Sequence, residues 1–151
     1  MQWKHPFRKT SEVDGKYNCI AWALGHTWTW YEPRIENYRY RLPKFLTRWP
    51  PEVPNEYSQE AYIKFFEYHG FERCSDGRLE HGIEKVAFYY IGLGIDRPHA
   101  CKQLKDGKWS SKMGNQEDVE HDLQSMEKGR YGEVVQFLKR ARLSAEETNR
   151  E

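Results

Sequence analysis

Three residue types in this sequence could together perform nucleophilic catalysis: a cysteine, a histidine and a polar residue that orients the histidine. Cys19 follows Asn18, a residue type that often caps helices, and opens the apolar run of "NCIAWALG". A thiol in the first turn of a helix is favoured as thiolate by the helix dipole. His99 follows Pro98 and begins a predicted strand, so its ring can face a cleft. The pair predicts that Cys19 attacks a carbonyl carbon while His99 accepts and returns the proton.

The third catalytic residue should come from the strand that pairs with the His99 strand. Asp106-Gly107 is a common two-residue hairpin turn, and it predicts that Lys105 pairs with Lys108. Counting outward from that turn places His99 opposite Gly114. A polar residue just beyond Gly114 would therefore lie near the imidazole.

Two residues beyond Gly114 compete for this role. Asn115 is the closest in register, whereas Asp118 lies four residues beyond Gly114 and reaches the ring only through a bulge or bend. A carboxylate stabilises the imidazolium that partners a thiolate, and this favours Asp118. We therefore predict Asp118 as the orienting residue, and the alternatives are Asn115, Glu117 and His121.

Local signals predict two helices that must position these groups. The first covers residues 18–25 and contains Cys19, and the second covers residues 56–71. Each helix has a plausible capping residue at its start and a glycine at its end, namely Asn18 and Gly25 for the first and Ser58 and Gly70 for the second.

Strand signals dominate the second half of the chain. The run "KVAFYYIGLG" at 85–94 is rich in β-branched and aromatic residues and predicts a buried strand. Residues 99–114 predict a hairpin, and residues 132–140 predict a closing strand. Helices that precede an antiparallel sheet are typical of an α+β fold, with the N-terminal helices packed on the C-terminal sheet.

The chain of 151 residues predicts a single domain, 1–151, with two irregular parts. Residues of about 26–55 form a proline- and aromatic-rich insert, because its prolines forbid long regular structure. The second part is a charged tail at about 142–151. Long irregular loops often line a functional site, so the insert is a candidate contact surface.

Composition restricts the partners and the compartment. The net charge of +1 argues against nucleic acid as a partner, because a phosphate-binding surface usually has a basic excess. No stretch approaches the length of about 18 apolar residues that a membrane helix needs, which argues against a membrane partner. The three scattered cysteines indicate neither a disulfide framework nor a CxxC metal pair, and they predict a reducing cytoplasm as the setting. No metal site and no cofactor are expected.

The chain resembles the NlpC-type and CHAP-type papain-like cysteine hydrolases in its order of motifs, with a cysteine on an early helix and then a strand that begins with histidine. It also resembles an uncharacterised bacterial group in four segments, Asn18–Gly25, Glu84–Tyr90, His99–Gly114 and Tyr131–Leu138. The resemblance implies a papain-like fold and an amidase or peptidase that acts through a thioester, with Cys19 as nucleophile and His99 as base. The insert has no counterpart in compact members of the superfamily, and the substrate stays open.

Other interpretations compete with the peptide or amide hydrolase. Cys19 can be a buried structural thiol, since free cysteine is among the most buried residue types. Cys101 shares a strand face with His99 and is a rival nucleophile, whereas Cys74 lies in a polar connector. The alternative function is a non-catalytic binding module on the same fold, which contacts a protein partner through the aromatic loop 26–54.

Overall fold

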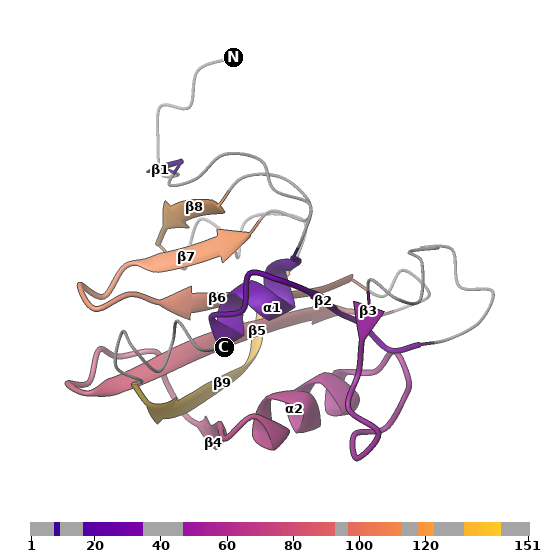
Figure 1. Ribbon diagram of the computed structural model, residues 1–151. Helices are drawn as coiled ribbons and strands as arrows, with labels where there is room; N and C mark the ends of the chain where they lie inside the picture. Colours follow the sequence, from indigo (N-terminus) through magenta and orange to yellow (C-terminus); the bar gives the residue numbers. More distant parts are fainter. Residues whose placement is uncertain are drawn as a thin grey trace.

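The computed structural model describes residues 8–9, 17–34, 47–92, 97–112, 118–122 and 132–142 (Figure 1). Within these ranges, seven strands form one antiparallel sheet in the order β1-β8-β7-β6-β5-β9-β4. Their bounds are β1 Arg8–Lys9, β4 Glu72–Cys74, β5 Ile83–Ile91, β6 Arg97–Gln103, β7 Trp109–Lys112, β8 Asp118–His121 and β9 Val134–Ala141. Two further short strands, β2 (Trp30–Tyr31) and β3 (Thr47–Arg48), pair in parallel.

The first helix, α1 (Cys19–Leu24), forms where the sequence predicts it. The Asn18 side-chain oxygen accepts a hydrogen bond from the Ala21 amide at 3.0 Å, which satisfies one of the unpaired N–H groups of the first turn. Gly25 ends the helix in the left-handed conformation at φ 86°, where a side chain would be strained. Both predicted ends of this helix are confirmed.

The Asn18 side chain also joins α1 to β2. Its amide nitrogen donates to the Tyr31 carbonyl at 2.9 Å, and its oxygen accepts from the Tyr31 amide at 3.3 Å. Asn18 is 8% exposed, so these bonds are shielded from water. One side chain therefore fixes both the start of α1 and the path of the segment that follows it.

The second helix, α2 (Gln59–Tyr68), begins at the predicted cap, because the Ser58 hydroxyl accepts from the Ala61 amide at 3.1 Å. It is shorter than the predicted range of 56–71, since the chain turns at His69 and Gly70. Its apolar face is buried through Ala61, Tyr62, Ile63, Phe65 and Phe66.

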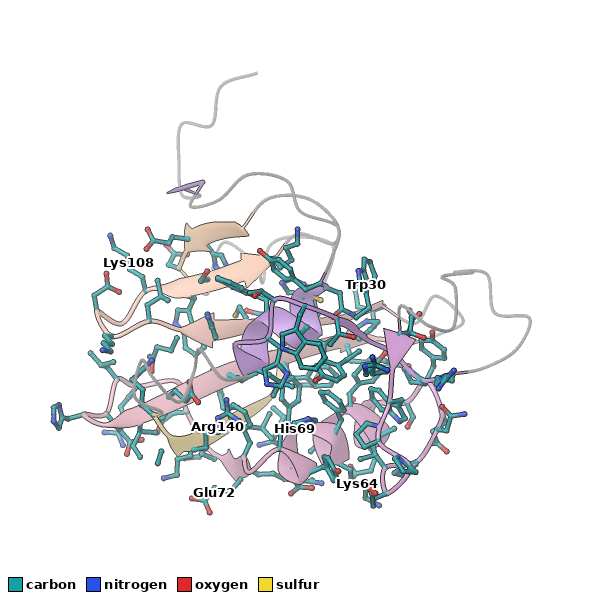
Figure 2. All side chains as sticks on the ribbon, viewed as in Figure 1. Trp30, Lys64, His69, Glu72, Lys108 and Arg140 are labelled. Atoms are coloured by element: carbon teal, nitrogen blue, oxygen red, sulfur yellow. The ribbon has the colours of Figure 1, made fainter. Side chains whose placement is uncertain are left out.

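Both helices pack on one face of the sheet. Side chains of α1 and α2 share one buried cluster with Val86, Phe88, Ala100 and Leu138 of the sheet. Arg140 of β9 crosses this interface and donates to the carbonyls of Leu24 and His69 at 3.0 and 2.9 Å, near the ends of the two helices (Figure 2). The guanidinium thereby satisfies helix-terminal carbonyls that would otherwise be unpaired.

The opposite face of the sheet has a smaller buried cluster of Ala87, Tyr89, Cys101 and Trp109. The segment between β4 and β5 runs over it: Gly77 lies so close that a Cβ there would come within 2.7 Å of Phe137. Lys85 anchors this segment through ion pairs to Asp76 at 3.1 Å and to Glu80 at 2.6 Å. Strand β4 lies in a segment that the sequence predicts to be a polar connector without regular structure.

The hairpin of β6 and β7 differs from the predicted register by one residue. Gln103 pairs with Trp109 and Cys101 with Ser111, because three residues rather than two form the turn. The Leu104 amide donates to the Lys108 carbonyl at 2.7 Å, and Gly107 takes φ 90°. The prediction of a two-residue Asp106-Gly107 turn is therefore wrong, and every β7 side chain lies on the opposite face from the one expected.

The prediction of an α+β fold with helices on an antiparallel sheet is confirmed, whereas the papain-like arrangement stays a prediction. The insert at 26–55 is described only at residues 26–34 and 47–55, where β2 and β3 give it more regular structure than expected. Of the predicted tail, residues 143–151 lie outside the described ranges. No helix in the described ranges is long and apolar enough to cross a membrane.

The Asn18 contacts make a prediction about stability. Asn18→Ala removes a helix cap and the two bonds to Tyr31, so we expect the free energy of unfolding to fall by about 2 kcal/mol. Ser58→Ala removes only the cap of α2 and should cost about 1 kcal/mol. Urea denaturation measures both values. Equal losses for the two variants would show that the bonds to Tyr31 contribute nothing.

Candidate functional site

Cys19 lies at the start of α1, where the sequence predicts it, and this end of the helix faces β6. Its thiol is 3.9 Å from the Pro98 carbonyl oxygen, to which it donates a weak hydrogen bond. The residue is 9% exposed. The nucleophile candidate is thus held between a helix and a strand, with little access for a substrate.

Burial raises the pKa of the Cys19 thiol to about 11. Hydrogen bonds from nearby backbone amides, that of Ala100 foremost, lower it in part, and the charge of Glu32 raises it further. A nucleophilic cysteine needs the opposite shift, towards a pKa below its ordinary value. Cys19 is therefore a protonated thiol at neutral pH, as expected of a structural cysteine.

His99 lies on the face of the sheet opposite α1. Successive strand residues point to opposite faces, and Lys102 of β6 places its ammonium 3.8 Å from the centre of the Trp22 ring in α1. Residues at odd positions, His99 and Cys101, therefore point away from α1. In agreement, the His99 ring is 5.8 Å from that of Tyr89, in the cluster on the far face. The structure does not bring Cys19 and His99 together.

Of the four candidates for the third catalytic residue, the structure describes the side chain of one. Asp118 begins β8 opposite Lys112, and its side chain is outside the described part. Asn115 and Glu117 lie outside the described residues altogether. His121 is the one candidate that the described structure connects to His99, and it does so through a residue that the sequence did not single out, Ser111.

A hydrogen-bonded chain of side chains crosses three neighbouring strands on the face away from the helices. His99 Nε2 of β6 is 3.2 Å from the Ser111 hydroxyl of β7, which is 2.6 Å from His121 Nε2 of β8. His121 Nδ1 in turn lies 2.7 Å from the Asp122 carbonyl oxygen. We call these three side chains the His-Ser-His chain. None of them is more than 4% exposed, so a substrate cannot reach the hydroxyl in this conformation.

The expected hairpin register explains why Ser111 was missed. A two-residue turn would place Lys112 opposite Cys101, and Ser111 would then face the helices. In the structure Ser111 is opposite Cys101 and shares the face of His99. Ser110 takes the helix side instead, where it accepts a hydrogen bond from the Trp22 indole at 3.1 Å.

The groups around Cys19 are acidic and phenolic rather than basic. Burial raises the pKa of Glu32, which a hydrogen bond with Tyr57 partly offsets. Tyr62 also has a pKa well above its ordinary value, chiefly because it is buried and then because of nearby Tyr57 and Glu32. These neighbours favour the neutral thiol, since a carboxylate near a thiol opposes its ionisation.

The structure also describes Cys101, Cys74 and other side chains of the types that can bind a metal ion. Cys101 is fully buried, and burial raises its pKa to about 12, so it is a poorer nucleophile still. Cys74 is half-buried, with its thiol 3.5 Å from the Asp76 carbonyl. Within the described ranges, no group of three or more histidine, cysteine or acidic residues could hold a metal ion.

A hollow of about 480 Å³ lies within the proline-rich insert, between residue 34 and residues 49–55. Trp49 and the prolines 50, 51 and 54 supply its apolar wall, and the remaining lining residues are Arg34, Glu52, Val53 and Asn55. Volumes of this size are typical of ligand sites. Arg34, Pro51, Glu52, Pro54 and Asn55 of its lining are exposed.

The state of Cys19 can be tested by alkylation. With a pKa of about 11, Cys19 has about a hundredfold less thiolate at neutral pH than an ordinary thiol. We expect iodoacetamide to modify Cys19 much more slowly than half-buried Cys74 at neutral pH, and His99→Gln to leave that rate unchanged. Mass spectrometry of the peptides reads out both sites. Faster modification of Cys19 than of Cys74, dependent on His99, would restore the nucleophile hypothesis.

Comparison with known proteins gives a family but no activity. No curated protein and no solved structure matches the chain. The family described as "Domain of unknown function (DUF7689)" matches residues 8–139, which is well over half of the 151 residues. The matched range includes both helices, the Cys19 region and the His-Ser-His chain. The chain therefore belongs to the DUF7689 family.

Proposed function

We propose that this protein is a non-catalytic binding module that keeps a papain-like order of elements and contacts a protein partner through segment 26–54. The start of α1 against β6 supports the papain-like arrangement, because a cysteine then lies at a helix start beside a strand. The buried, neutral thiol and the position of His99 on the far face favour binding over a Cys19–His99 amidase or peptidase.

The observation that carries this proposal is the hollow in the proline-rich loop. Its walls are preformed: the Trp49 indole donates to the Pro54 carbonyl at 3.0 Å, and the Val53 amide donates to the Pro50 carbonyl at 3.1 Å. Trp49 also stacks on Phe65 of α2, with ring centres 4.7 Å apart. A rigid site loses less conformational entropy on binding than a mobile loop does.

Arg34 is the cationic group of the hollow, and Glu52 is the acidic one. The Asn55 side chain accepts from the Arg34 amide at 2.6 Å and donates to the Arg34 carbonyl at 3.1 Å, which fixes the backbone of the arginine. The side chain itself is exposed. A guanidinium binds carboxylates with two parallel hydrogen bonds, and proline and tryptophan walls favour an apolar neighbour. The partner class is therefore a polypeptide segment with a carboxylate beside an apolar side chain.

A second exposed group in the same segment supports a contact surface there. Trp28 is 49% exposed and stacks on His26, with ring centres 5.4 Å apart. Large exposed aromatic side chains are common at interfaces, because they bury much apolar area with few rotatable bonds. Trp28 and the hollow together provide an aromatic and a cationic contact within residues 26–55.

The proposal can be tested by selecting short random peptides against the purified protein. We expect enriched peptides to contain Asp or Glu next to Leu, Pro or an aromatic residue. Arg34→Glu should weaken their binding by about tenfold or more, which corresponds to about 1.4 kcal/mol. Fluorescence anisotropy of the labelled peptides measures the affinities.

Lys108→Glu is the matched control, because it makes the same charge change at an exposed residue. Lys108 lies at the tip of the β6–β7 hairpin, at the other end of the molecule from the proline-rich loop (Figure 2). Binding should be unchanged in this variant. The proposal fails if both variants bind equally, or if selection enriches no acidic peptides. Hydrolysis of a peptide or amide that is lost in Cys19→Ser would favour the enzyme instead.

A further inference from the structure

The donors and acceptors of the His-Ser-His chain fit together in one direction when both imidazoles are neutral. The Asp122 carbonyl can only accept, so His121 carries its proton on Nδ1. His121 Nε2 is then an acceptor, and the Ser111 hydroxyl donates to it at 2.6 Å. The Ser111 oxygen accepts in turn from the Nε2–H of His99 at 3.2 Å.

A proton on His121 conflicts with this direction. Protonated His121 has N–H groups on both ring nitrogens, so Nε2–H and the Ser111 hydroxyl hydrogen would point at each other across 2.6 Å. The Ser111 hydroxyl would then have to turn its hydrogen away from both rings and accept from each of them, so the bond that it donates to His121 Nε2 is lost. His99 is different, because a second proton on its Nδ1 leaves the bond from Nε2–H to Ser111 intact.

The surroundings of His121 also disfavour its charged form. The residue is 4% exposed, and burial lowers its pKa, although the carbonyl and charge of Asp122 offset part of this effect. Of the other described groups, Trp109 lies directly opposite on β7, and Cys101 and Tyr89 extend the same face beyond His99. Glu120 alternates to the helix face, where Arg8 of β1 is its partner in register.

The His121–Ser111 bond ties a short edge of the sheet to its centre. Strand β8 has four residues, and beyond it β1 has only two described residues. Short edge strands have few backbone bonds to hold them and open first in local unfolding. The loss of one buried side-chain bond therefore weighs more here than in the longer strands β5 and β9.

We propose that the His-Ser-His chain is an acid-sensitive latch: protonation of His121 ends the bond that Ser111 donates to it, places a buried charge between the strands and so favours release of β8 and β1 from β7. The sign follows from linkage. A histidine whose pKa is lowered in the folded state stabilises that state above its unfolded pKa of about 6.5, and this contribution is lost as the pH falls below that value. The latch is closed at neutral pH and opens in mild acid.

Hydrogen exchange of the full chain tests this proposal. Between about pH 7.5 and about pH 5.5, after correction for intrinsic exchange, we expect the protection of β8 amides to fall about tenfold relative to β5 amides. His121→Gln keeps an acceptor for Ser111 and does not titrate, so its β8 protection should not change with pH. His81→Gln, at an exposed histidine before β5, should retain the pH dependence of the natural protein.

Two results would overturn the latch: β8 protection that stays constant relative to β5 over this range, or a pH-dependent loss that persists in His121→Gln. If His121→Gln does not fold, nitrogen-15 NMR of the natural protein decides. The latch requires His121 to be the Nδ1–H tautomer at about pH 7.5 and to lose that state in mild acid. An Nε2–H tautomer, or a ring already charged at neutral pH, contradicts it.

Discussion

Along β6, successive side chains point to opposite faces of the sheet, and this alternation determines which groups can meet. On the helix side of the strand, the Cys19 thiol donates to the Pro98 carbonyl, and the Lys102 ammonium lies over the Trp22 ring. On the far side, the His99 ring is hydrogen-bonded to Ser111, which is hydrogen-bonded to His121. The backbone of β6 therefore lies between the Cys19 thiol and the His99 imidazole, whereas a cysteine–histidine catalytic pair needs both groups within hydrogen-bond reach. The Cys19 thiol therefore lies near the Glu32 carboxyl group, and the two imidazoles share the Ser111 hydroxyl.

Local signals in the sequence were sufficient for the helices. Asn18 and Ser58 cap them as predicted, and Gly25 ends the first, because a cap depends on residues within one turn. The apolar run of β5 was also readable, since it is buried on both faces of the sheet. The pairing of β4 with β9 depends on residues more than sixty positions apart, and no local pattern encodes it.

The candidate site was less predictable, because it depends on a single residue of register. Asp106-Gly107 is compatible with both a two-residue and a three-residue turn, because both place a residue at positive φ, and the two differ by one residue in length. That small difference decides whether Ser110 or Ser111 faces His99. Cys19 was placed correctly at a helix start, yet its protonation state is set by burial and by the charge of Glu32, which depend on how the rest of the chain packs around it.

The two ends of the molecule are held by side chains that differ in how they form hydrogen bonds. The Arg140 guanidinium bonds the carbonyls at the ends of both helices, and a guanidinium can only donate. The layer of helices that supports the proline-rich loop is thus held by bonds of fixed direction. The far edge of the sheet is held by an imidazole, whose ring nitrogens can each donate or accept. Acid would therefore loosen one border of the protein while the other kept its shape, and substitutions could adjust the two properties independently.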